Sequence, residues 1–282
     1  LRVIGIRPIN NIVDITNFVL MEIGQPLHAF DLNKVKNHKI EVKTLAAGTK
    51  FTTLDGVERE LEGKEAMVCN AQEAMCMGGI YGGLDSGVSA ETTDVLLESA
   101  YFDPVVIRKA AKTHGLHTDA SFRYERGADP NITLYALKRA ALLIKEIAGG
   151  AISSEIKDVY PSTIEPVKID LRYSYMDSLI GKSIERALVK NILTSLNIQT
   201  ANENEEGLTA IVPTNKVDVT RPCDLVEEIL RIYGYNNVEI SESVKSCLNQ
   251  THKPNPDKVQ NLVSDYLAAN GFNEVMNNSL TK

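Results

Sequence analysis

The stretch around which this sequence is organised is GLHTDASFRYERGADP, residues Gly115 to Pro130. It is rich in polar side chains and lies between two predicted helices. The pair Asp103-Pro104 begins the first helix as an N-cap followed by a first-turn proline, and Gly115 can end it. Asp129-Pro130 begins the second, which runs through residues 134–148. Such a polar segment can hold a ligand, although a solvated loop with local ion pairs has the same composition.

The residues before this stretch predict one helix and several short strands. Residues 10–23 have the amphipathic pattern of a helix that Gly24 ends. Residues 24–31, GQPLHAFD, predict a turn that positions His28. The Asp55-Gly56 pair predicts the turn of a hairpin. Strand-like runs are found at 40–45, 50–61, 66–70, 74–79 and 95–101.

The alternation of these patterns predicts three parts. Residues 1–162 indicate a mixed α/β domain, and residues 163–242 indicate a smaller α/β domain in which Ser183 caps a helix. Residues 243–282 predict a linker, a helix that begins at Pro256, and the start of a strand. The expected fold class is therefore α+β. The chain lacks an initial methionine and stops just after this strand-like start, so we expect a piece of a longer protein.

Composition limits the possible functions. The net charge is −7 and the pI is about 5.4, which argues against a protein that coats nucleic acid but allows one local basic site. The four cysteines, Cys69, Cys76, Cys223 and Cys247, form no CxxC pair, which favours a reducing compartment over a disulfide framework or a zinc site. We find no signal peptide and no apolar run long enough for a membrane span.

Glu98 is an unusual residue in the apolar run VLLESAY, residues 95–101. In a strand it shares one face with Leu96 and Ala100. A carboxylate among such neighbours is costly unless it meets a donor. It either reaches water or an arginine at a sheet edge, or it is an acceptor in an apolar pocket that awaits a hydroxyl group.

Four acidic residues lie in or just before the predicted helix from Pro222 to Tyr233. Asp224, Glu227 and Glu228 have the i, i+3, i+4 spacing that places them on one face, and Asp218 precedes them. Oxygen ligands of this kind suit Mg²⁺. The alternative is that the helix dipole stabilises acids near the N-terminus without any metal.

Three further segments accompany the opening stretch: RPINNIVDITNFVLMEIGQPLHAFD (7–31), GGIYGGLDSGVSAETTDVLLESAYF (78–102) and VPTNKVDVTRPCDLVEEILRIYGY (212–235). In this order the four segments resemble the beta chain of bacterial phenylalanyl-tRNA synthetase. The resemblance implies an internal fragment with the editing domain at 1–162, the fifth domain, helix-turn-helix-like in character, at 163–242, and the start of the catalytic-like module after a linker.

The resemblance also implies partners and cofactors. It implies a cytoplasmic heterotetramer of two alpha and two beta chains that joins phenylalanine to tRNA(Phe). ATP is used by the alpha chain and not by this fragment. Mg²⁺ is shared with the alpha chain, at positions that match Asp218, Asp224, Glu227 and Glu228. An acidic helix disfavours DNA as a partner, because phosphate is repelled.

Residue by residue, the resemblance implies an editing pocket for Tyr-tRNA(Phe). Glu98 matches the residue that recognises the tyrosine hydroxyl, and His28 matches the editing histidine. Gly82 matches a glycine that leaves room for the substrate backbone. The remaining matches line the pocket and are Thr16, Asn17, Thr118 and Ala120.

The reaction implied is hydrolysis of the ester between tyrosine and the terminal ribose. No Ser/His/Asp pattern is evident, and His114-x-x-His117 lacks a third metal ligand of matching spacing, so we expect attack by a positioned water. Arg123 and Arg126 are candidates for contacts with the tRNA end, or they pair with neighbouring acids. Two alternatives are a non-catalytic tRNA- or subunit-binding module and a regulator that binds an aromatic amino acid.

Overall fold

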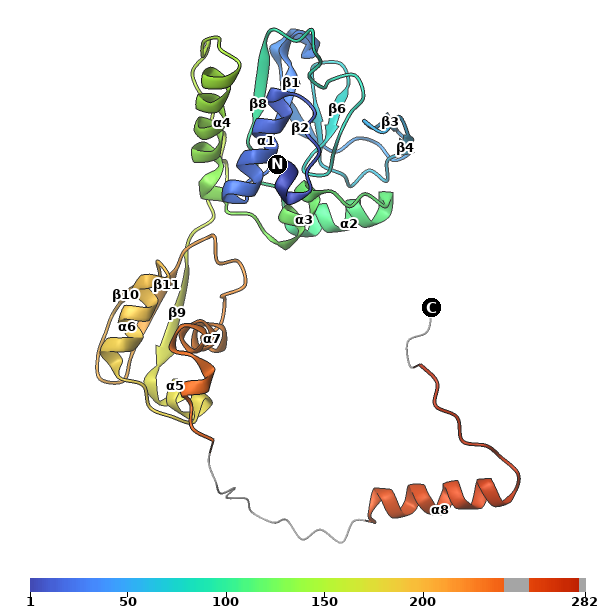
Figure 1. Cartoon of the computed structure of the whole chain (residues 1–282), viewed down its shortest axis with the longest axis vertical. Helices are drawn as coiled ribbons and strands as arrows, with labels where there is room; N and C mark the ends of the chain where they lie inside the picture. Colours follow the sequence, from blue (N-terminus) through green and yellow to red (C-terminus); the bar gives the residue numbers. More distant parts are fainter. Residues whose placement is uncertain (241–253, 279–282) are drawn as a thin grey trace. The chain divides into compact units, whose positions relative to one another are not determined.

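The computed structural model describes residues 1–240 and 254–278. The chain divides into two compact units, Leu1–Val238 and Glu239–Lys282. Figure 1 shows the first unit as two groups of helices and strands that succeed each other along the chain. Five short 3-10 helices are described: η1 (Arg2–Ile4), η2 (Leu32–Lys34), η3 (Lys36–His38), η4 (Pro130–Ile132) and η5 (Tyr235–Asn237).

Helix α1 (Asn11–Ile23) forms as predicted. The Asn10 side chain accepts a hydrogen bond from the amide of Val13, and Gly24 ends the helix in the left-handed conformation with φ of 80°. Ile15 and Val19 are buried against Ala136 and Ala140 of α4 (Thr133–Ile147), and Leu97 packs against the same cluster. This cluster fixes α1 and α4 beside each other (Figure 1).

The segment GQPLHAFD is not only a turn. Its second half is strand β1 (His28–Asp31), which pairs antiparallel with β8 (Val95–Glu98). His28 and Glu98 are direct partners in this register. The turn prediction was wrong for these residues because a four-residue strand carries little periodic signal, and its partner is distant in the chain.

A four-stranded antiparallel sheet forms the middle of the first group of elements. Its strand order is β2 (Glu41–Lys43), β5 (Met67–Cys69), β6 (Ala74–Met77) and β7 (Tyr81–Gly82). Beside it the predicted hairpin is present as β3 (Lys50–Thr52) and β4 (Glu58–Glu60), with Gly56 at φ of 77° in the turn. The core under these strands includes Phe30, Met67, Met77 and Ile107.

Helix α2 (Pro104–His114) begins and ends where the sequence predicts. Asp103 accepts bonds from two first-turn amides, and Gly115 ends the helix with φ of 63°. The polar stretch after it contains a helix that we did not predict, α3 (Asp119–Arg126). Thr118 caps α3, and Tyr124 on its inner face is buried. The stretch is therefore ordered by packing, unlike a solvated loop.

Residues 167–238 form a separate core. The antiparallel order is β10 (Gln199–Ala201), β11 (Gly207–Val212) and β9 (Val167–Arg172), and β10 was not predicted. The helices are α5 (Tyr173–Ile180), α6 (Arg186–Ser195) and α7 (Pro222–Tyr233). The predicted Ser183 cap was wrong: Glu185 is the N-cap of α6, and Ser183 Oγ donates instead to Asp177 Oδ2 at 3.2 Å.

The mixed helices and antiparallel sheets confirm the α+β fold class. Helix α8 (Pro256–Ala269) is present as predicted, but residues 272–278 form no strand, so that part of the prediction was wrong. Residues 243–253 of the predicted linker, with Cys247, and residues 279–282 lie outside the described residues. The domain boundaries at 162 and 242 stay predictions. Within the described residues, no helix is long and apolar enough to span a membrane.

Candidate functional site

A pocket of about 270 Å³ brings together residues from five separated segments. Its walls come from α1, from the paired strands β1 and β8, from the β3–β4 turn, from β7 and from the start of α3. Seven of the predicted editing residues line it: Thr16, Asn17, His28, Gly82, Glu98, Thr118 and Ala120.

Two polar atoms in this pocket are buried without a partner. Glu98 Oε2 and His28 Nε2 have no hydrogen-bond partner among the residues that the structure describes. An unsatisfied buried polar atom costs about 1–3 kcal/mol, so such atoms usually await a ligand or an ordered water. Cross-strand pairing places the two residues opposite each other on β1 and β8. The pocket therefore has two adjacent hydrogen-bonding positions open to a ligand.

Burial shifts both ionisable groups of this pair toward their neutral forms. It raises the pKa of Glu98 to about 7 and lowers the pKa of His28 to about 4. The His28 ring also packs edge-on against Phe30, with ring centroids 4.4 Å apart. At neutral pH the imidazole is therefore uncharged, while the Glu98 carboxyl is close to its titration point.

Gly82 leaves space that any side chain would fill. A Cβ atom at this position would lie 3.0 Å from His28 Cε1 and 2.8 Å from Leu54 Cδ1. Such contacts are closer than van der Waals packing allows, so even alanine would push against the histidine or the leucine. The absence of a Cβ at Gly82 keeps the floor of the pocket open.

The two threonines of the pocket have hydroxyl groups that are already engaged. Thr118 Oγ1 accepts from Ser121 N at 3.0 Å and donates to Ile80 O at 2.9 Å. Thr16 Oγ1 donates to Val13 O at 2.8 Å. The Thr118 hydroxyl is therefore engaged as the cap of α3.

Several lining residues were not anticipated from the sequence. Leu54, Cys76, Phe102 and Tyr124 also line the pocket. Tyr124 Oη donates to Ala100 O at 2.9 Å, which ties α3 to the chain just after β8. Tyr124 lies in the opening stretch, where an aromatic residue among polar neighbours was the available signal. The others are core-like side chains whose place in the pocket depends on contacts distant in sequence.

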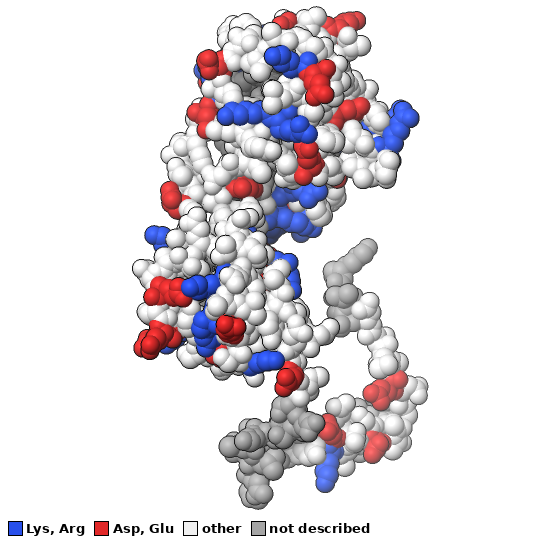
Figure 2. Space-filling model, turned by 60° about the vertical axis from the view of Figure 1, so that its left-hand side comes forward, with Lys and Arg blue, Asp and Glu red and all other residues white. Residues whose placement is uncertain are grey.

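Neither arginine of the opening stretch lines this pocket. Arg126 Nη1 pairs with Glu125 Oε1 at 2.5 Å, and its guanidinium lies 3.6 Å from the centroid of the Phe122 ring. Arg123 is half-buried on the same helix. The pairing alternative thus describes Arg126, while contacts with tRNA stay a prediction. Basic and acidic side chains are interspersed over the face shown in Figure 2.

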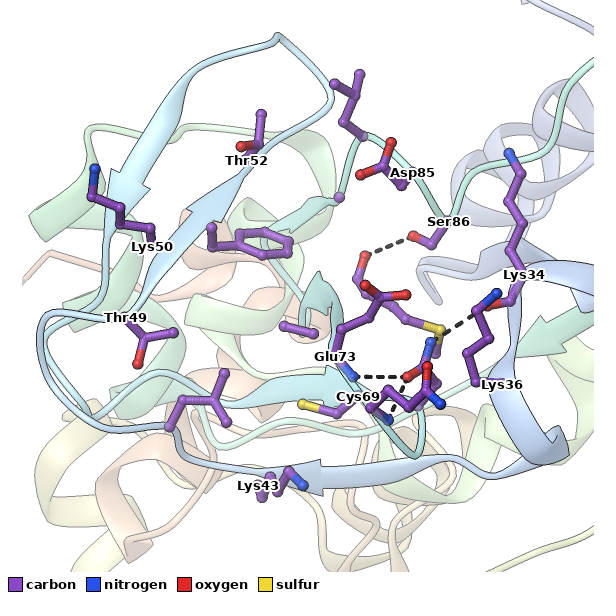
Figure 3. A pocket seen from close by; sticks show the side chains of 18 of the residues that line it. Lys34, Lys36, Lys43, Thr49, Lys50, Thr52, Cys69, Glu73, Asp85 and Ser86 are labelled. Atoms are coloured by element: carbon purple, nitrogen blue, oxygen red, sulfur yellow. Dashed lines mark hydrogen bonds between the residues drawn. The ribbon is translucent and has the colours of Figure 1, made fainter.

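A second pocket of about 620 Å³ lies between the β3–β4 hairpin and the sheet. Figure 3 shows lysines at its edge together with Glu73 and Asp85. Lys43 and Lys50 are paired with Glu41 and Glu58. This pocket contains none of the predicted site residues, so we assign the candidate site to the smaller pocket.

Two of the three acids of α7, Asp224 and Glu228, are held by cations. Asp224 Oδ1 accepts from Arg221 Nη2 at 2.7 Å, and this guanidinium holds the pKa of Asp224 well below its usual range. Glu228 accepts from Arg231 at 3.0 Å and from Lys216 at 2.7 Å. No group of three or more His, Cys, Asp or Glu in residues 1–240 and 254–278 is placed to hold a metal. The predicted set, with Asp218 and Glu227, does not fit Mg²⁺ as arranged here.

This arrangement predicts the response of the chain to Mg²⁺. Binding at these acids would require two ion-pair networks to open, so we expect the melting temperature to be the same in MgCl₂ and in NaCl of equal ionic strength. Thermal unfolding of the chain in both salts measures this. A rise in melting temperature that Mg²⁺ alone produces would show that the acids rearrange around the ion.

Comparisons with known proteins agree with this architecture. Residues 1–149 match the model of the B3/4 domain, and residues 169–235 match that of the tRNA synthetase B5 domain. The chain is 56% identical over 285 residues to the phenylalanine–tRNA ligase beta subunit of Bacteroides fragilis, covering 100% of this chain and 34% of that protein. The beta subunit of Thermotoga maritima is 41% identical over 272 residues, which cover 96% and 34% of the two chains.

Among solved structures, an N-terminal fragment of the phenylalanyl-tRNA synthetase beta subunit from Pyrococcus horikoshii aligns with a TM-score of 0.42 at 15% identity. The alignment covers 79% of this chain and 65% of that one. The family assignment rests on the two domain models and the sequence identity. This chain spans about a third of the length of the curated relatives. It belongs to the phenylalanine–tRNA ligase beta-subunit family, and it contains a B3/4 domain followed by a tRNA synthetase B5 domain.

Proposed function

We propose that the pocket between α1, β1, β8 and α3 is an editing site that hydrolyses mischarged Tyr-tRNA(Phe). The observation that carries this proposal is the Glu98 carboxyl, whose Oε2 atom is buried and lacks a hydrogen-bond partner within the described part of the chain. A site for a purely apolar side chain has no use for such a group. A site for tyrosine uses it to bind the phenolic hydroxyl.

Discrimination follows from the hydroxyl group. The tyrosine O–H donates to the ionised Glu98 carboxylate, whereas phenylalanine leaves the same carboxylate buried and unpaired. A site built to bind a substrate hydroxyl rejects the analogue without it far more strongly than an apolar pocket rejects an added hydroxyl. A ligase that selects phenylalanine in an apolar pocket needs a second site of this kind.

Hydrolysis in this pocket uses a positioned water. The water oxygen adds to the ester carbonyl, the bond to the ribose oxygen breaks, and the products are tyrosine and tRNA with a free terminal hydroxyl. His28 is uncharged at neutral pH, since its pKa is about 4, so its open Nε2 position can orient the ribose or the water by a hydrogen bond. Gly82 leaves space for the ester group beside it. Positioning is therefore the main contribution of the protein.

The whole-protein role is proposed from the family to which the chain belongs. We propose that the chain is part of a cytoplasmic ligase of two alpha and two beta chains. In this assembly the alpha chain attaches phenylalanine to tRNA(Phe) with ATP. This chain removes tyrosine attached in error. Mg²⁺ at Asp218, Asp224, Glu227 and Glu228 requires a rearrangement that the alpha chain would have to induce.

Hydrolysis of Tyr-tRNA(Phe) beside Phe-tRNA(Phe) tests the editing function, first with this chain and then with a complete ligase that carries it. We expect the tyrosyl ester to be lost faster. Equal rates for the two esters in the complete ligase would reject the proposal. A titration with free tyrosine distinguishes the editing site from a regulator that binds an aromatic amino acid. A regulator binds the free amino acid tightly, whereas an editing site requires the ester with the tRNA end.

A further inference from the structure

The turn of the β3–β4 hairpin forms one wall of the candidate pocket. Leu54 lies in this turn and lines the pocket. Its amide donates to Gly82 O at 3.0 Å, and its side chain occupies the space beside the missing Cβ of Gly82. The position of this wall depends on how firmly the turn is held.

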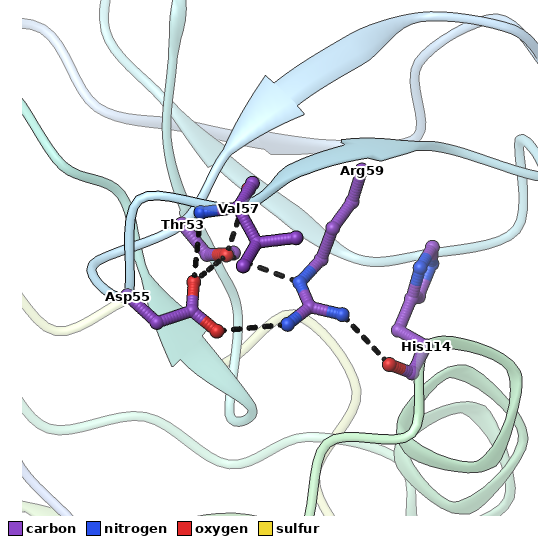
Figure 4. A network of polar contacts seen from close by, with 5 residues as sticks. All are labelled: Thr53, Asp55, Val57, Arg59 and His114. Carbon is purple, nitrogen blue, oxygen red and sulfur yellow. Dashed lines mark hydrogen bonds and ion pairs between the residues drawn. The ribbon is translucent and has the colours of Figure 1, made fainter.

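Arg59 holds the turn from β4. Its Nε atom donates to Thr53 Oγ1 at 3.0 Å, and its Nη2 atom donates to Asp55 Oδ2 at 2.9 Å. Thr53 is fully buried, and its hydroxyl lies 2.5 Å from Asp55 Oδ1. Figure 4 shows the three side chains in one closed network. Both acceptors are chain neighbours of Leu54, so the network fixes the backbone on each side of the pocket residue.

The third bond of Arg59 reaches another element. Its Nη1 atom donates to the carbonyl oxygen of His114 at 2.8 Å, at the C-terminus of α2 (Figure 4). A cation is favourable there because the helix dipole leaves partial negative charge on the last carbonyls. The His114 ring is itself buried and lies against Glu65, with Nε2 and Oε1 2.9 Å apart. The end of α2 is therefore a firm anchor.

From this anchor the chain passes directly into the opposite wall of the pocket. After Gly115 the link leads to Thr118, the cap of α3, and Thr118 and Ala120 line the pocket. Arg59 is thus tied at one side to the wall that carries Leu54. At the other side it is tied to the corner between α2 and α3.

We propose that Arg59 is a positioning residue for the editing reaction. Its hydrogen bonds to both walls set their separation, and this separation determines how the tyrosyl group fits against Glu98. This inference rests on the function proposed above. Arg59 lies outside the pocket lining and acts through Leu54 and the start of α3. A planar guanidinium can serve three acceptors in fixed directions, which a lysine ammonium on the same backbone cannot reproduce.

The variant Arg59→Met tests this positioning role in a complete ligase that carries this chain. We expect kcat/KM for hydrolysis of Tyr-tRNA(Phe) to fall about 10- to 100-fold, because a misplacement of about 1 Å has an effect of this size. The loss should appear mainly in kcat, and the preference for the tyrosyl over the phenylalanyl ester should fall with it. Arg59→Lys should restore part of the loss.

Two further variants separate positioning from folding. Asp55→Asn removes one acceptor of Arg59 at a partly exposed position, so the fold is retained while the ester preference falls in the same direction. Lys50→Met is the matched control, because it removes the exposed Lys50–Glu58 pair of the same hairpin, away from its turn. Its ester preference should equal that of the wild type. Thermal unfolding of all variants confirms that they are folded at the assay temperature.

Hydrogen exchange at the Leu54 amide gives a measurement that does not depend on activity. We expect faster exchange in Arg59→Met, since the bond to Gly82 O then opens more often. If both Arg59→Met and Asp55→Asn show the Leu54 exchange rate and the ester preference of the wild type, the proposed positioning role of Arg59 is overturned. If the wild-type ligase itself does not prefer the tyrosyl ester, the proposed function fails, and exchange alone decides whether Arg59 holds the turn.

Discussion

Glu98→Ala should lower hydrolysis of Tyr-tRNA(Phe) on the order of 100-fold and leave hydrolysis of Phe-tRNA(Phe) nearly unchanged. The physical reason is that only the tyrosyl ester can satisfy the buried carboxylate with its hydroxyl group. In the variant neither ester finds an acceptor, so the two rates converge. Single-turnover deacylation of both esters with the complete ligase measures the ratio directly.

Glu98→Gln is the conservative variant, and its rate of Tyr-tRNA(Phe) hydrolysis should lie between those of the wild type and Glu98→Ala. Its amide oxygen keeps an acceptor of similar shape, but a neutral acceptor binds the phenol more weakly than a carboxylate. Glu22→Gln is a matched control, because Glu22 lies on α1 at the surface and pairs with Arg139 at 2.9 Å. An unchanged ester ratio in Glu98→Ala would mean that Glu98 does not read the hydroxyl group.

The second large effect concerns stability and pH. The pKa of Glu98 is raised by burial from 4.5 to about 7, so the folded chain holds a proton that the unfolded chain has released between these values. This contribution to stability is present at low pH and is lost as pH rises toward 7. The pKa of His28 is lowered from 6.5 to about 4, so its contribution is present above pH 6.5 and is lost as pH falls toward 4.

In the wild type the two slopes oppose each other between pH 4.5 and 6.5 and largely cancel. Single substitutions should reveal them. Relative to the wild type, Glu98→Gln should gain about 3 kcal/mol of unfolding free energy as pH rises from 4.5 to above 7. His28→Gln should gain a similar amount, about 3 kcal/mol, as pH falls from 6.5 to 4.

Urea unfolding of the wild type and both variants at several pH values measures these differences, and shared titrations of other residues cancel in the comparison. Stability curves that run parallel for the wild type and Glu98→Gln would show that Glu98 is not buried as an unpaired carboxyl. Parallel curves for His28→Gln would show the same for the histidine.

Much of the fold was predictable because its signals are local. Asn10 and Gly24 bound α1, Asp103 and Gly115 bound α2, and the hairpin turn at Gly56 follows from its residue types. Each signal depends on hydrogen bonds within a few residues or on a left-handed backbone position, so the chain segment alone decides it. Strands β1 and β10 and helix α3 were missed because short elements are chosen by what they pack against.

The candidate site also has features that the sequence predicted and features that it did not. The pocket residues were predicted mainly from the resemblance of four segments to a known family, and the structure places seven of them around one cavity. The engaged Thr118 hydroxyl and the cations on Asp224 and Glu228 were not foreseen. A spacing rule places acids on one helix face but cannot say that Lys216, from outside the helix, will approach that face.

The sequence by itself determined the helix ends, the hairpin turn and the set of polar residues from which a site can be built. Only the tertiary structure decided that β1 pairs with β8, which places His28 opposite Glu98 in one pocket, and that Arg59 joins the two walls. The physical reason is that both the pKa shifts and the open hydrogen-bonding positions arise from desolvation. Desolvation is a property of neighbours brought together from distant parts of the chain, and no short segment contains it.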